Sequence, residues 1–120
     1  MDIRKTKEYY ETLDEEELCS CAYCRNYYQE IRNSYPVLEN YLKGIGIAIE
    51  KPFETMPLEP YNGMIEYIAV QYIVMGDSSD FKENDIAGVH ISIAQSHPMT
   101  DIKEKHFVIE LSEIRLKWTM

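Results

Sequence analysis

The period of apolar and polar positions changes near the middle of the chain. Up to residue 44 the apolar side chains recur at steps of three and four, which is typical of helices. Beyond residue 46 they form short runs and alternations, which are typical of strands. The sequence therefore predicts an α+β domain in which N-terminal helices pack on a three- to four-stranded, mainly antiparallel sheet.

The first half predicts two helices separated by a proline. Thr12 and Glu15 fit a capping box, which predicts a helix N-terminus followed by helix over residues 14–34. Its apolar stripe consists of Leu18, Cys21, Cys24, Tyr28, Ile31 and Tyr35. Pro36 disfavours the α conformation at the residue before it. We therefore expect a break there and a shorter second helix that ends near Gly44.

The second half predicts one interior strand and one edge strand. Residues 65–75 are apolar on both faces, which is typical of a strand inside a sheet. If this strand is regular, Ile65, Tyr67 and Ala69 share one face with Ile73, and Val70 lies on the other. The prolines of the segment 51–57 favour an edge strand or irregular chain.

The last strand carries a change of parity. Its apolar positions are Phe107, Ile109 and Leu111, followed by Ile114, Leu116 and Trp118. Side chains in a strand alternate between faces, so a shift of one position predicts a β-bulge. We expect it near Ser112 and Glu113, with both apolar sets buried.

Composition and charge narrow the function classes. The chain has 120 residues and no apolar run near the roughly 20 residues that cross a membrane. Its polar N-terminus lacks the apolar core of a secretory signal, so we expect a single cytoplasmic domain over residues 1–120. The net charge is -9. It disfavours nucleic acid and anionic membranes as partners and suits a basic protein.

All three cysteines lie within six residues, as Cys19-Ser20-Cys21-Ala22-Tyr23-Cys24. Cys21 and Cys24 have the spacing common in structural zinc sites, and Cys19 offers a third thiolate. The fourth ligand would be His97, with His90 and His106 as further candidates. On one continuous helix Cys19 would point about 140° away from Cys24. The thiols therefore converge only if the helix begins near Ser20.

Two other interpretations of the cysteines remain open. A C-x-x-C pair at a helix N-terminus can cycle as a disulfide, although the acids at 14–17 would raise the thiol pKa here. Alternatively, Cys21 and Cys24 fill the core, because free cysteine is among the most buried residue types. Cys19 would then lie apart from them. In that case Cys21→Ser would cost about 1–3 kcal/mol by burying a hydroxyl.

Tyrosines suggest a recognition surface on the same helix. The chain has 10 tyrosines, and Tyr23 and Tyr27 fall off the apolar stripe beside Asn26. Exposed tyrosine is enriched at interfaces. We therefore expect Tyr23, Asn26 and Tyr27 to face an unidentified protein partner or a second copy of the chain. No nucleotide-binding or hydrolase motif is present, so no catalytic residue is assigned.

The run from Cys19 to Tyr27, the Tyr35-Pro36 step and the stretch Gly44-Ile45-Gly46-Ile47 resemble a group of small uncharacterised bacterial proteins. That group carries a C-x-C-x-x-C-x-N-aromatic motif, a Tyr-Pro step and a Leu-Gly-Ile-Asp stretch. Ile45 and Ala48 stand here where the group has Leu and Asp. The resemblance implies a stand-alone bacterial domain and, since the group has no established activity, no function.

These observations together predict a small cytoplasmic binding or regulatory module without catalysis and without a bound cofactor. The alternative is a zinc- or thiol-dependent enzyme or redox switch centred on Cys19, Cys21 and Cys24. A further alternative is an acidic inhibitor of a basic or nucleic-acid-binding protein, which the net charge would suit.

Overall fold

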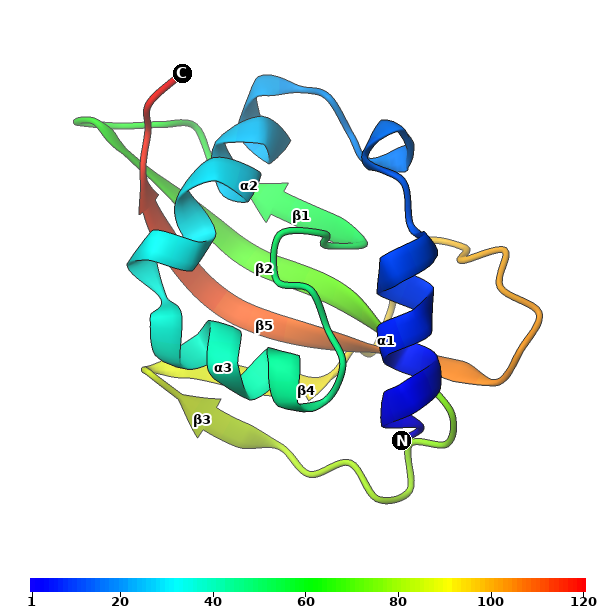
Figure 1. The fold of residues 1–120 in the computed structure, drawn as a ribbon. Coiled ribbons are helices and arrows are strands. Elements are labelled where there is room, and N and C mark those ends of the chain that lie inside the picture. Colours follow the sequence, from blue (N-terminus) through cyan, green and yellow to red (C-terminus); the bar gives the residue numbers. More distant parts are fainter.

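Five strands form one antiparallel sheet in the computed structural model, which describes residues 1–120 (Figure 1). The order is β1-β2-β5-β4-β3. The strands are β1 Glu54–Pro57, β2 Met64–Met75, β3 Asn84–Ile86, β4 Val89–Ile93 and β5 His106–Lys117. The interior position of β2 and the edge position of β1 are as predicted. The fifth strand is the short β3, in a segment where the polar sequence gave no strand pattern.

Three α-helices precede the strands, which confirms the α+β class. They are α1 Ile3–Thr12, α2 Ala22–Ser34 and α3 Pro36–Gly44, with a 3-10 turn at Glu15–Glu17. Figure 1 shows α2 and α3 over one face of the sheet and α1 beside the end of β2. None of these helices combines the length and the apolar character that crossing a membrane requires.

The helices differ from the prediction before residue 22, because α1 was not predicted and the helix expected from residue 14 begins only at Ala22. Thr12 is the last residue of α1 and does not begin a helix. Asp14 caps the short 3-10 turn, and Leu18 is extended, so the chain leaves the helical conformation before the cysteines. Four adjacent carboxylates repel one another, and this short exposed turn keeps them in water. The predicted break at Pro36 is confirmed, because Pro36 is the first residue of α3.

In both β2 and β5, the positions whose side chains face the core shift by one residue, at the same level of the sheet. In β5 the change predicted near Glu113 is confirmed, since Ile114 and Leu116 are buried in the same core as Ile109 and Leu111. Strand β2 changes as well, and its regular alternation was a wrong prediction. Its core-facing residues are Ile65, Tyr67, Val70, Tyr72 and Val74.

One residue in each strand produces this paired kink. Ile68 and Glu113 oppose each other, and they alone leave the otherwise continuous pairing of β2 with β5. Glu113 has a φ of 59°, the left-handed region that few non-glycine residues adopt. Because both strands carry one extra residue, the pairing register of β2 with β5 is the same on either side of the kink. The alternation of core-facing side chains shifts by one position in both strands.

Helix α1 completes the hydrogen bonding of β2 where β1 ends. The β1 pairing reaches only Gln71. Beyond it, the Tyr10 hydroxyl accepts from the Ile73 amide at 2.9 Å and donates to the Ile73 carbonyl at 2.8 Å. The Thr6 hydroxyl accepts from the Met75 amide at 2.9 Å. Thr6 and Tyr10 lie one turn apart, so one face of α1 takes the place of a neighbouring strand.

Replacement of Tyr10 tests this role. Tyr10→Phe should lower the free energy of unfolding by about 1–3 kcal/mol, because two buried backbone groups of Ile73 lose their partner. Urea denaturation measures the difference. Tyr9→Phe is the matched control, since the half-buried Tyr9 hydroxyl bonds no protein group, and it should change stability by less than about 0.5 kcal/mol. Equal losses in both variants would contradict the edge-covering role of Tyr10.

Candidate metal centre

The three cysteine thiols come together at the N-terminus of α2. Their sulfur atoms all lie within 4.8 Å of one another. Cys19 lies in the preceding loop, Cys21 is the N-cap of the helix, and Cys24 lies in its first turn. The sequence predicted that the three thiols converge only if the helix begins near Ser20, and α2 begins at Ala22. The prediction that Cys19 lies apart from the other two thiols was therefore wrong.

The cluster lies half in the core and half at the surface. Cys24 is buried, whereas Cys19 and Cys21 are exposed, so the prediction that Cys21 is buried was also wrong. As an N-cap, Cys21 turns out of the helix and its Sγ accepts from the Cys24 amide at 3.4 Å. The Cys24 Sγ lies 3.4 Å from the Thr55 hydroxyl of β1. A bound ion would therefore have one side in the protein and one side in water.

The two helical thiols differ in acidity. Partial burial raises the pKa of the Cys21 thiol, but the hydrogen bonds it accepts from the Cys24 amide and the neighbouring thiols hold that pKa below its usual value. Burial raises the pKa of the Cys24 thiol to about 12, although the hydrogen bond with Thr55 lowers it. Cys21 is thus the readier thiolate, and a metal must displace the proton of Cys24.

Two tyrosines hold the thiol-bearing loop in place. The Tyr28 hydroxyl donates to the Cys19 carbonyl at 2.9 Å, and the Tyr67 hydroxyl donates to the Tyr23 carbonyl at 2.5 Å. Burial and then the nearby thiols raise the pKa of Tyr28. Both phenols therefore remain donors near neutral pH and fix the backbone on either side of Cys21. No local sequence pattern links Tyr67 to the thiols, because Tyr67 lies on β2, far along the chain from the cysteines.

The predicted recognition surface on α2 is corrected by the structure. Asn26 and Tyr27 are fully buried, and Tyr23 is half-buried against Trp118. The Asn26 amide nitrogen donates to the Lys117 carbonyl at 2.8 Å, and its oxygen accepts from the Thr119 amide at 2.9 Å. These contacts fasten the first turns of α2 to the end of β5. Because the helix starts at Ala22, its buried stripe runs through Cys24, Tyr27 and Ile31.

None of the histidines joins the three thiols. The group of ligand atoms within 4.8 Å of one another contains Cys19, Cys21 and Cys24 and no imidazole. His97 follows β4, where its Nδ1 lies 2.8 Å from the Pro98 carbonyl oxygen. His90 pairs with Asp85 at 2.8 Å, and the Nε2 of His106 lies 2.7 Å from the Thr100 hydroxyl. The structure therefore does not bring His97 to the cysteines as a fourth ligand.

The thiol spacing fits a single tetrahedral ion. Zinc–sulfur bonds of about 2.3 Å place the sulfurs of a tetrahedral site about 3.8 Å apart. Sulfurs that already lie within 4.8 Å of one another reach this spacing by small side-chain rotations. Three thiolates are a soft donor set that selects zinc or Cu(I) over magnesium and calcium. The fourth position would face the surface beside Cys19 and Cys21.

The chain matches no protein-family model, no curated protein and no solved structure.

The N-cap position of Cys21 reverses the expected effect of its replacement. In metal-free, reduced protein, Cys21→Ser should be at least as stable as the native chain, because serine is a preferred N-cap. Cys21→Ala should be about 1 kcal/mol less stable than Cys21→Ser, because it leaves the Cys24 amide without an acceptor. Urea denaturation with a chelator present measures both. A loss of 1–3 kcal/mol in the serine variant would instead indicate a buried Cys21.

Proposed function

We propose that this protein is a small non-catalytic binding module in which Cys19, Cys21 and Cys24 hold one zinc ion. The observation that carries the proposal is the convergence of all three sulfurs within 4.8 Å at the start of α2. These thiols come from a loop, an N-cap and a first helical turn, so one ion would join the extended segment before α2 to the helix itself.

The electrostatics of the helix start support a thiolate-bound cation. The N-terminus of a helix carries a partial positive charge from its free amides, which stabilises thiolate at Cys21. The buried Cys24 thiol keeps its proton in the metal-free state, since burial raises its pKa to about 12. Zinc binding would release that proton, and the affinity would rise with pH.

The surroundings of the cluster favour a structural role for the ion. A catalytic zinc site pairs an activated water with a nearby acid or base. Here the group of converging ligand atoms contains no histidine, aspartate or glutamate, and the Tyr28 and Tyr67 hydroxyls donate to backbone carbonyls. A water molecule or a side chain of a binding partner would complete the tetrahedron at the exposed side.

A thiol switch is the second candidate, and the proximity of the thiols favours it. Cys21 has a lowered pKa and would be the attacking thiolate toward a disulfide oxidant. Exchange with that oxidant would leave an internal disulfide between Cys21 and one neighbour, and one thiol free. The two candidates therefore differ in metal content and in the number of free thiols.

Metal analysis combined with thiol titration tests the proposal. Protein purified under reducing conditions should carry about one zinc per chain, with its thiols protected until a chelator is added. Cys19→Ser and Cys24→Ser should lose most of this zinc, whereas Ser20→Ala in the same loop is the matched control and should retain it. Zinc-free protein with three free thiols would overturn the proposal. Zinc-free protein that oxidises to one free thiol would favour the switch.

A further inference from the structure

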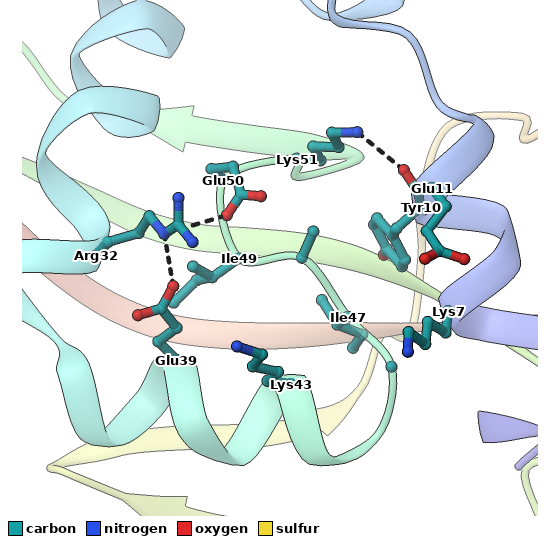
Figure 2. A pocket seen from close by; sticks show the side chains of 12 residues that line it. Lys7, Tyr10, Glu11, Arg32, Glu39, Lys43, Ile47, Ile49, Glu50 and Lys51 are labelled. Carbon is teal, nitrogen blue, oxygen red and sulfur yellow. Dashed lines mark hydrogen bonds and ion pairs between the residues drawn. The ribbon is translucent and has the colours of Figure 1, made fainter. Parts of the chain in front are cut away.

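A cavity of about 480 Å³ lies among the three helices and the segment that joins α3 to β1 (Figure 2). Its volume falls in the range of about 300–1,000 Å³ that is usual for small-molecule sites. Its walls come from Lys7 and Tyr10 of α1, Arg32 of α2, Lys43 of α3 and the segment 46–51. The thiols of the proposed zinc site are not among its lining residues.

One side of the cavity is apolar and fixed. Tyr10, Ile47 and Ile49 line it and belong to the main hydrophobic core, and the half-buried Ala48 lies between the two isoleucines. Gly46 has a φ of 91°, and a Cβ there would lie 2.7 Å from the Ile3 carbonyl oxygen. The segment therefore packs directly against α1, and a side chain at position 46 would push the wall away from the helix.

Basic side chains are concentrated around this cavity, and two of them, Arg32 and Lys51, already have partners within the protein. Four of the chain's 12 lysines and arginines line it, although the chain carries a net charge of -9. Arg32 pairs with Glu39 at 2.6 Å and with Glu50 at 3.6 Å. The Lys51 ammonium donates to the carbonyls of Tyr10 at 2.9 Å and Leu13 at 2.8 Å. Arg32 thus pairs with two of the three lining acids, Glu39 and Glu50.

Lys7 and Lys43 make no ion pair and no side-chain hydrogen bond within the protein. Figure 2 shows them on different walls, Lys7 on α1 and Lys43 on α3. The remaining acid, Glu11, lies one turn beyond Lys7 on α1 and is likewise unpaired. The cavity thus offers two free ammonium groups against one free carboxylate, beside an apolar surface.

The backbone of the same segment adds free donors. A turn closed by the Lys51 amide and the Ala48 carbonyl at 3.0 Å lines the cavity, and the amides of Ala48, Ile49 and Glu50 donate to no group in the protein. Consecutive free amides in a turn are a common anion-binding element. Like the two lysines, these amides favour a negatively charged ligand.

We propose that this cavity binds a small organic anion. Its carboxylate, sulfonate or phosphate group would lie between Lys7 and Lys43, and its apolar part would lie on Ala48, the one apolar lining residue that is not buried. This inference does not depend on the zinc ion, because the cavity and the thiol cluster share no residue.

Fluorescence titration of the full chain with 8-anilinonaphthalene-1-sulfonate tests this proposal, with phenyl phosphate as the competing ligand. The native protein should bind the probe at one saturable site, and phenyl phosphate should displace it. Lys7→Gln and Lys43→Gln should each weaken binding about tenfold, since each removes a charge-assisted hydrogen bond. Lys82→Gln is the matched control, because this exposed lysine lies away from the cavity and makes no ion pair. It should bind like the native protein.

Two further variants sharpen the result. Ala48→Phe should abolish binding by filling the cavity while the near-UV circular dichroism stays native, and Glu11→Gln should tighten binding by removing a like charge. Equal affinity in the native chain, Lys7→Gln and Lys43→Gln would overturn the proposal, as would the absence of saturable binding. Cys24→Ser should bind the anion normally, so a failure of the zinc proposal is distinguishable from a failure of this one.

Discussion

The paired kink at Ile68 and Glu113 is the constraint on which the helical layer depends. Side chains of a strand alternate, so without one extra residue in each strand the two halves of β2 and β5 would turn their apolar faces to opposite sides. With the kink, Ile65 and Leu116 at one end join Val74 at the other in one core of 18 buried residues. Helix α2 packs near the first end, and α1 covers the edge near the second.

The thiol cluster follows from this placement of α2. Contacts from β2 and β5 fix its first turns, through the Tyr67 hydroxyl on the Tyr23 carbonyl and through Asn26 on the Lys117 carbonyl. Cys24 therefore contacts Thr55 of β1, and Cys21, as N-cap, remains at the surface. The loop before the helix then returns Cys19 to the same point. Tertiary contacts therefore gather three thiols that a continuous helix would have separated.

Local signals were sufficient for much of the fold but not for the site. Pro36 correctly predicted a helix boundary, and the shift in the apolar alternation of β5 correctly predicted a kink. Both signals can be recognised within a single segment of the sequence. The matching kink in β2 was missed because Ile68 is itself apolar and hides the change. The thiols converge because α2 begins at Ala22 with Cys21 as its N-cap. The Thr-x-x-Glu match instead predicted a helix start at Thr12, and cysteine is not a common N-cap residue that would have indicated the true start. Tyr67 lies 44 residues from the carbonyl it binds, a contact that no local pattern encodes.

X-ray absorption at the zinc edge of the zinc-loaded protein tests the central claim, that the three thiols form one metal centre. A zinc ion held by Cys19, Cys21 and Cys24 should show about three sulfur neighbours near 2.3 Å and one oxygen or nitrogen neighbour near 2.0 Å. The Cys21→Ser variant, with its helix start preserved, should lose one sulfur neighbour and keep the other two. A shell of oxygen and nitrogen alone, or one that Cys21→Ser leaves unchanged, would contradict the account.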